Sequence, residues 1–466
     1  GVFLSKGAPE VLLEKCAYIQ KDTNVVALTP QMKKDILREI RKLQVKSMRT
    51  LGFAYKTIDK SAMQVALTYE NELAISEDLG FYESGKDLIF GGFVGIVDPL
   101  RKGVKESIQI AYDAGVKVKM LTGDNINTAK AIGKEIGLLE DGKKAVEATY
   151  IDVLSDEELR EEINDISIVA RSKPDTKMRI VQALQSNLEV VAVTGDGIND
   201  APALSKADVG ISMGISGTEV SKNASDIILT DDSFSTIVDG IKWGRGIYEN
   251  FQRFIQFQLT VNIVAFMIAV ISQIMDTEMP FTTIQLLWVN IIMDGPPALA
   301  LGLEPVRDYV LKRKPIKRKA SIIAKNMLAN IIINAVLIIS IVNLQSFFNV
   351  LNASPEEQGT VVFSVFAFSA LFNALSCREF GLNSVIPNFF KNKLALYVIF
   401  ITGIVQVLFT QVFRSFFNSV ALSNFMWIKI ILLSSMVLIL NEAVKFILRV
   451  MRKQGHMVRN IRRVNK

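Results

Sequence analysis

Three polar residues that could carry out phosphoryl chemistry follow one apolar segment. The β-branched run 190–193 ends at Thr194-Gly195-Asp196-Gly197, and Asn199 and Asp200 come directly after it. In an open α/β sheet, the ligand crevice lies outside the carboxyl ends of the strands. Acidic side chains in that crevice can hold Mg²⁺ and a phosphoryl group together. The spacing predicts such a site here; the alternative is a glycine-rich turn with solvated acids.

Other short apolar runs predict further strands of the same sheet. Val116–Leu121 leads into Thr122-Gly123-Asp124 with a helix behind it, and Ile166–Ala170 leads into Arg171 and the helix that Lys177 begins. Runs at 209–211 and 227–229 complete five strands with interleaved helices, the pattern of a doubly wound parallel sheet. We expect the following side chains to meet on one rim of that sheet: Asp124, Arg171, Lys177, Asp196 and Asp200.

The eleven-residue string Thr194–Leu204 resembles the hinge motif of the P-type cation-transporting ATPases, whose phosphorylation domain has a haloacid-dehalogenase-like α/β fold. The resemblance implies that Asp196 is a direct Mg²⁺ ligand, that Lys177 stabilises the transferring phosphoryl group, and that Asn199 and Asp200 order the loop. The residues it places at the nucleotide, ATP, are Lys6, Arg49, Thr122, Gly123, Asp124, Arg171, Lys177 and Asn199.

The first ninety residues resemble the C-terminal part of the nucleotide-binding α+β lobe of that family. Lys6 opens KGAPE, and Arg49 lies between a predicted helix at 30–48 and a strand at 51–55. Taken alone, these cations could be a solvated loop charge and a helix-end arginine. Asp98-Pro99-Leu100-Arg101 resembles the hinge at which the two domains join. The predicted parts are 1–93 for the nucleotide lobe, 94–234 for the phosphorylation domain, 235–448 for the stalk and membrane helices, and 449–466 for the tail.

The nucleophile of the family is the Asp of a DKTGT segment, and no such segment occurs in this sequence. We expect it upstream of Gly1, with the actuator domain and the first membrane helices. The chain as given is therefore not expected to form an aspartyl phosphate or to turn over ATP.

Composition places part of the chain in a membrane. Of its 466 residues, 50% are hydrophobic, and two cysteines and one histidine leave oxygen atoms as the ligands for any metal. Ser235–Gln252 predicts a stalk helix. Six apolar segments near the ~20 residues needed to span a bilayer follow at 254–275, 283–303, 327–350, 361–377, 394–413 and 425–448.

Basic residues crowd the loops around 307–325 and 378–393 and the tail 449–466, whereas the alternate loops are nearly free of them. The positive-inside rule predicts that the α/β part, these loops and the tail are cytoplasmic, in the plasma membrane or in a vacuolar or other endomembrane. The tail could bind a calmodulin-like protein or anchor the last helix. The role as an anchor is favoured because the tail is short.

Polar residues inside these segments predict an ion site. Asn262 lies in the first segment, and Asn290 and Asp294 are expected four apart on one helical face, before an unwound Gly295-Pro296-Pro297. A hard cation such as Ca²⁺ takes 6–8 oxygen ligands, which such groups can supply. The alternative is a kinked helix with a packing Asn and a protonated Asp.

The strings LTVNIVA and LWVNIIMDGPPALALG resemble the calcium-transporting members of the family, and Ala265 and Met293 make them most like the plasma-membrane type. The predicted function is part of an ATP-driven Ca²⁺ pump that uses ATP and Mg²⁺ and transports one Ca²⁺, with no nucleic-acid partner. The alternatives are a P-type pump for another cation and a non-catalytic, nucleotide-binding membrane regulator.

Overall fold

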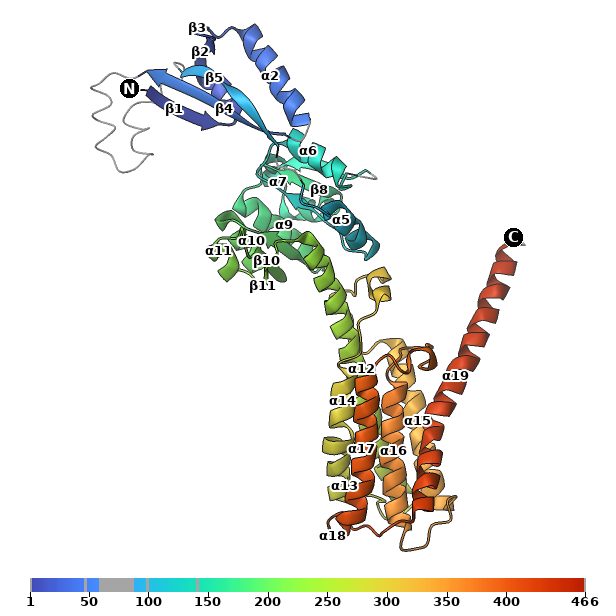
Figure 1. The fold of residues 1–466 in the computed structure, drawn as a ribbon. Coiled ribbons are helices and arrows are strands. Elements are labelled where there is room, and N and C mark those ends of the chain that lie inside the picture. The colour runs from blue at the N-terminus through green and yellow to red at the C-terminus, as the bar shows by residue number, and fades with distance from the viewer. Residues whose placement is uncertain (1, 46–47, 58–87, 98–99, 140–141, 465–466) are drawn as a thin grey trace. The chain divides into compact units, whose positions relative to one another are not determined.

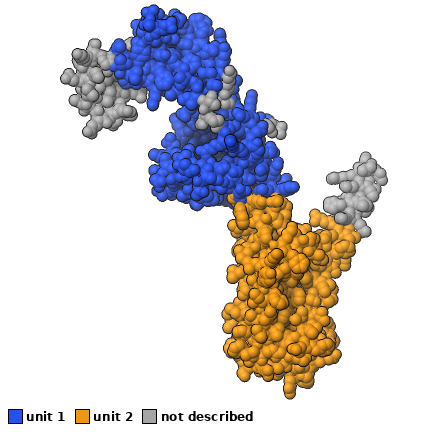
Figure 2. All heavy atoms as spheres, viewed as in Figure 1, with its two compact units in different colours: residues 1–239, 311–319 blue, residues 240–310, 320–466 orange. Residues whose placement is uncertain are grey.

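The computed structural model describes residues 2–45, 48–57, 88–97, 100–139 and 142–464, with side chains through Arg452. It divides into two compact units (Figure 2). The α/β unit consists of residues 1–239 and 311–319, and the helical unit consists of residues 240–310 and 320–466. The hinge residues Asp98 and Pro99 lie outside the described residues.

The α/β unit begins with a mixed five-stranded sheet in the order β1-β4-β5-β2-β3 (Figure 1). Its elements are β1 (Val2–Gly7), α1 (Pro9–Lys15), β2 (Cys16–Lys21), β3 (Asn24–Ala27), α2 (Pro30–Val45), β4 (Met48–Thr57) and β5 (Leu88–Val97). Helices α1 and α2 cover one face, where Leu13, Ile40 and Phe90 are buried. The strands alternate, so the opposite face carries exposed side chains.

Parallel strands and helices then alternate along the chain. The elements are α5 (Val104–Asp113), β6 (Met120–Leu121), α6 (Ile126–Glu135), β7 (Lys144–Glu147), α7 (Ala148–Val153), α8 (Asp156–Glu162), β8 (Ile166–Ala170), α9 (Pro174–Ser186), β9 (Ala192–Gly195), η1 (Ile198–Asp200), α10 (Ala201–Lys206), β10 (Val209–Met213), α11 (Glu219–Asn223) and β11 (Ile227–Leu229). All five residues of β8 are buried, as in a strand covered on both faces.

The predicted α/β class and parallel pairing are confirmed, but the single five-stranded sheet is wrong. The strands form two parallel sheets of three, in the orders β6-β8-β7 and β11-β10-β9. The strand expected at 116–121 has only two residues, and the N–H of Val116 donates to Ala111 O at 2.9 Å, which keeps Val116 in the turn after α5. That bond, with Gly115 in the left-handed region at φ 74°, ends α5 in a Schellman-type turn.

The helical unit begins at Gly240, within one long helix. Its elements are α12 (Phe234–Ile274), α13 (Thr283–Trp288), the π-helix η2 (Val289–Met293), α14 (Gly295–Leu301), η3 (Asp308–Lys312), α15 (Lys325–Phe348), α16 (Gln358–Ser376), η4 (Ile386–Asn388), α17 (Lys393–Val412), α18 (Arg414–Phe417) and α19 (Asn424–Val464). Six spans in the described part are long and apolar enough to cross a membrane, α13, η2 and α14 forming one of them. The six predicted segments are confirmed as helices, and residues 235–252 form one continuous helix with the first of them, as predicted.

Helix α16 lies at the centre of the helical unit. It packs against α15, α17 and α19, and nearly all its residues from Thr360 to Ser376 are buried. Phe366 stacks on Phe281 with ring centroids 4.8 Å apart. The π-helix and α14 also contact α16, and Asp294, between these two elements, is buried in the packed interior.

Candidate functional site

The end of β9 holds a cluster of polar groups. The Lys177 ammonium contacts Asp200 Oδ1 at 2.5 Å, and the side chains are only 15% and 13% exposed. The other oxygen of Asp200 accepts the N–H groups of Asp196 at 3.3 Å and Gly197 at 3.1 Å. Lys177 stands in the first turn after β8 and Asp200 follows β9, so this contact joins the ends of strands from two sheets.

Gly195 makes this approach possible. A Cβ at that position would lie 2.4 Å from the Cβ of Asp200, a separation that real atoms do not adopt. Any side chain here would displace the carboxylate that orders the turn.

Asp196 itself is held by its backbone and leaves its side chain exposed. Its carbonyl accepts the N–H of Thr218 at 2.9 Å and the hydroxyl of Ser221 at 3.1 Å. The turn is therefore fixed while its carboxylate stays open to a ligand. Asn199, in the neighbouring 3₁₀ turn, is exposed as well.

The ends of β6 and β8 form a second cluster. The N–H of Arg171 donates to Asp124 O at 3.0 Å, and the Thr122 hydroxyl donates to Asp124 Oδ2 at 3.3 Å. Arg171 has φ 52°, a left-handed conformation that costs a non-glycine residue energy and that is common at functional sites. Gly123 is exposed at the same turn.

Lys6 and Arg49 share the open face of the five-stranded sheet. Lys6 pairs with Phe53 across β1 and β4, and Arg49 lies four residues from Phe53 on the same side of β4. On this face the exposed Phe53 lies opposite Lys6, and Arg49 lies about 13 Å from Phe53 along β4. Arg49 also reaches the second cluster, because its Nε lies 3.7 Å from Asp124 Oδ1.

The predicted rim is therefore brought together in two groups. Asp200, Asp196 and Lys177 form one, and Asp124 and Arg171 form the other. No hydrogen bond or ion pair between the two groups is found among the described residues.

In the helical unit, Asp294 is fully buried between η2 and α14. Neither of its carboxylate oxygens has a hydrogen-bond partner among the described residues. Burying an ionised carboxylate without a partner is costly, so such a group is expected to receive a cation or a proton.

The predicted shared face of Asn290 and Asp294 is wrong. The N–H of Asp294 donates to Val289 O at 2.9 Å, the i−5 bond of a π-helix, so buried Val289 stands one turn before it. Asn290 is exposed. Asn262 is exposed too, and its amide donates to Gln258 O of its own helix at 2.9 Å. Among the described residues, no hydrogen bond joins the three predicted ligands, and only Asp294 is buried.

The predicted unwinding at Gly295-Pro296-Pro297 is also wrong. These residues form the first turn of α14, where proline is tolerated because its missing N–H would be unpaired there. The irregular backbone lies one turn earlier, in η2. The prolines still cannot donate to the carbonyls that precede them, which leaves oxygen atoms free near Asp294.

Comparison with known families covers most of the chain. Three family models match: P-type ATPase, cytoplasmic domain N, over residues 2–103; haloacid dehalogenase-like hydrolase over 119–241; and cation transporting ATPase, C-terminus, over 278–447. The chain belongs to the P-type cation-transporting ATPases.

Its relatives within the P-type ATPases are named as calcium transporters. The chain is 39% identical over 452 residues to a probable calcium-transporting ATPase 6, plasma membrane-type, from Oryza sativa subsp. japonica, covering 95% of this chain and 42% of the relative. It is 37% identical over 438 residues to calcium-transporting ATPase 8, plasma membrane-type, from Arabidopsis thaliana, covering 91% of this chain and 40% of the relative. The chain thus spans about two-fifths of these P-type ATPases.

One residue that supports the rim of this P-type ATPase, Asp232, was not predicted from the sequence. The Asp232 carboxylate accepts the N–H groups of Gly214, Ile215 and Ser216 at 2.7–3.0 Å, and these begin the loop that leads to Thr218. Burial raises the pKa of Asp232, but these donors outweigh it and bring the pKa to about 2. Arg101 donates to the Asp232 carbonyl, which ties the hinge sequence to the same loop.

Proposed function

We propose that this chain supplies the nucleotide face, the phosphoryl-transfer rim and six membrane helices of an ATP-driven calcium pump. The observation that carries the proposal is Asp294, a fully buried carboxylate without a hydrogen-bond partner among the described residues. It occurs in the same chain as a rim suited to phosphoryl transfer. Membrane carboxylates are costly to maintain and mark ion pathways by default.

Asp196 fits the role of Mg²⁺ ligand. Mg²⁺ binds proteins through one or two carboxylates plus water and substrate phosphates, and no cluster of three or more His, Cys, Asp or Glu occurs among the described residues. When bound there, the ion would neutralise charge on the phosphoryl oxygens. Lys177, fixed by Asp200, would hold a second positive charge at the same strand end.

The proposed nucleophile would reside on a strand that fits between the two parallel sheets. Strands β6 and β9 are edges of separate sheets. The ion pair between Lys117 and Glu189, at 3.1 Å, links the segments that precede these two edges. A strand inserted between two neighbours separates them by about 9.6 Å, which two extended side chains can bridge.

The exposed asparagines suggest how the cargo site is completed. Asn262 and Asn290 are exposed on membrane-spanning helices, where the bilayer would meet polar groups at a cost. We propose that another membrane segment covers them, contributes a further carboxylate, and encloses one Ca²⁺ together with Asp294. The cytoplasmic position of the α/β unit and the plasma or vacuolar membrane are part of the same proposal, and calmodulin binding by the tail stays a prediction.

The test is Asp294→Asn in a longer protein that includes the nucleophile. Ca²⁺-activated phosphorylation from ATP should be lost, whereas phosphorylation by inorganic phosphate, which needs no bound ion, should survive. Asp276→Asn is the matched control, because Asp276 is an exposed acid just past α12 and should leave both reactions unchanged.

Undiminished Ca²⁺ activation in Asp294→Asn would refute the ion site. Activation by a different cation in the unmodified protein would instead favour another P-type pump. Failure of the unmodified protein to form any phosphoenzyme would favour a non-catalytic regulator.

A further inference from the structure

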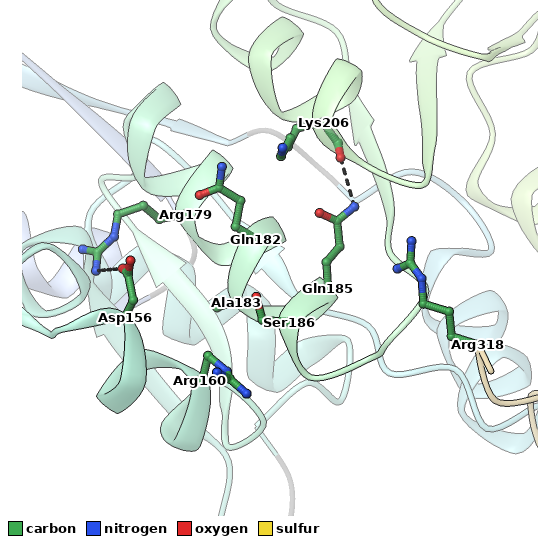
Figure 3. Close-up of a pocket in the computed structure, with 9 residues that line it drawn as sticks. All are labelled: Asp156, Arg160, Arg179, Gln182, Ala183, Gln185, Ser186, Lys206 and Arg318. Carbon is green, nitrogen blue, oxygen red and sulfur yellow. Dashed lines mark hydrogen bonds and ion pairs between the residues drawn. The ribbon is translucent and has the colours of Figure 1, made fainter.

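A cavity of about 490 Å³ opens on the α/β unit between α8, α9, α10 and the segment 311–319 (Figure 3). This volume is within the range of small-ligand sites. Its lining contains one carboxylate, Asp156, and four cations: Arg160, Arg179, Lys206 and Arg318. We refer to it as the basic pocket.

Two of the four cations are neutralised within the protein. Arg179 pairs with Asp156 at 2.8 Å, as Figure 3 shows. Arg318 makes a bidentate contact to Asp208, with distances of 3.0 and 2.5 Å. These pairs fix the walls of the basic pocket and leave little net charge of their own.

Arg160 and Lys206 are the remaining cations, and neither has an acidic partner within the described part of the chain. They reach the pocket from different helices, α8 and α10 (Figure 3). The side chains of Gln182 and Ser186 add neutral hydrogen-bonding groups. The pocket therefore has two cations on its polar lining that are in no salt bridge within the described residues.

We propose that the basic pocket binds a compact anion with two or more phosphate groups. Guanidinium and ammonium groups are the usual ligands of phosphate, and two cations from separate helices suit two separated phosphates better than one. The volume also exceeds what a single phosphate fills. An inositol polyphosphate has this chemistry, whether free or as the headgroup of a lipid.

Two helices, α9 and α10, connect the basic pocket to the rim. Helix α9 carries Lys177 in its first turn, at the rim, and ends at the pocket with Ser186, about 14 Å further along the helix. Helix α10 begins directly after Asp200 and ends with Lys206. An anion that joins these helix ends would restrain the elements that position Lys177 and Asp200. The binding itself does not depend on the proposed transport function.

The test uses the full chain in detergent and inositol hexakisphosphate as the probe, titrated by calorimetry at 150 mM salt. The double variant Arg160→Gln/Lys206→Gln should bind about tenfold or more weakly. The matched control is Lys34→Gln/Arg41→Gln, which removes the same charge from exposed positions on α2 and should change the affinity less than about twofold.

Hydrogen exchange locates the bound probe independently. Protection should appear in residues 182–186 and 205–208 of the unmodified chain and disappear in the pocket variant. Equal affinities in the two double variants, or protection confined to the tail 449–466, would overturn the proposal.

A second arm distinguishes the sources of the anion. Vesicles of phosphatidylcholine with 5% phosphatidylinositol bisphosphate are compared with the free probe. Pocket-dependent binding of the vesicles alone assigns a lipid headgroup, and pocket-dependent binding of the free probe assigns a soluble anion. Binding of neither probe rejects the site.

Discussion

Asp200 and Asp294 are carboxylates of the same chain in opposite circumstances. Asp200 is engaged by one ammonium group and two backbone N–H groups. Asp294 is more deeply buried, yet both of its oxygens lack a partner among the described residues. The α/β unit thus presents a preorganised carboxylate, whereas the helical unit presents one that is satisfied only when something binds.

The difference indicates which of the two sites depends on a bound ligand for its support. At the rim, the supporting contacts are complete, so a ligand can bind to the exposed Asp196 without rearranging them. In the helical unit, the charge of Asp294 has no support until a cation or proton arrives. Such a group can therefore report whether the site is occupied.

The largest expected difference between the two carboxylates is in how their substitution changes the stability of the full chain. Asp200→Ala leaves Lys177 without its counter-charge and two N–H groups without an acceptor, so we expect a loss of about 2–4 kcal/mol in the α/β unit. Asp294→Asn removes a buried charge that has no partner, and should be neutral or stabilising. Thermal unfolding in detergent measures both, and an equal loss would contradict the comparison.

Gly195→Ala should be nearly as damaging as Asp200→Ala. The added methyl group would lie 2.4 Å from the Asp200 Cβ, so the carboxylate must move. Overpacking of this kind costs about 1–3 kcal/mol. Gly123→Ala is the control, because a Cβ there meets no atom within 4 Å. The same unfolding temperature for both alanine variants would show that the turn at Gly195 can relax.

Nucleotide binding tests whether the open face of the five-stranded sheet is also preorganised. Lys6→Ala and Arg49→Ala should each weaken ATP binding to the full chain by about five- to tenfold, the loss of one charged hydrogen bond. Lys34→Ala, an exposed cation on the covered side of the sheet, should change nothing. Unaltered affinity in both site variants would remove them from the nucleotide site.

The smallest expected effect concerns acid stability. The pKa of Asp232 is lowered from 3.8 to about 2, so the folded state favours its ionised form. This contribution is complete above pH 4 and is lost as the pH falls from about 4 to 2. The stability of the α/β unit should decline less steeply over that interval in Asp232→Asn than in the unmodified chain. Parallel declines would show that the loop does not depend on this carboxylate.

Sequence patterns predicted what hydrophobic periodicity controls. The six apolar segments, the buried strand β8 and the helix that joins stalk to membrane follow from runs of apolar residues, whose burial is their main driving force. The turn at Asp196 was predicted because its polar residues, Asp196, Asn199 and Asp200, are close together in the sequence.

Contacts that side chains make with groups far away in the sequence were not predicted. Asp232 holds N–H groups 16–18 residues before it, and Arg318 reaches Asp208 across 110 residues. The error at Asn290 has another cause, since an α-helical period was assumed where the helix widens to a π-turn. Nothing in the apolar pattern of Val289–Met293 distinguishes the two.

That π-helix has a consequence for the second half of its span. A helix rotates by about 100° per residue, so one residue gained or lost in η2 re-phases every side chain from Asp294 onward. The number of residues in Val289–Met293 thus sets the direction, around the helix axis, in which Asp294 and the residues after it project. Shortening the segment by one residue would leave its hydrophobicity and length almost unchanged, yet would swing the carboxylate from the interior toward a different neighbour.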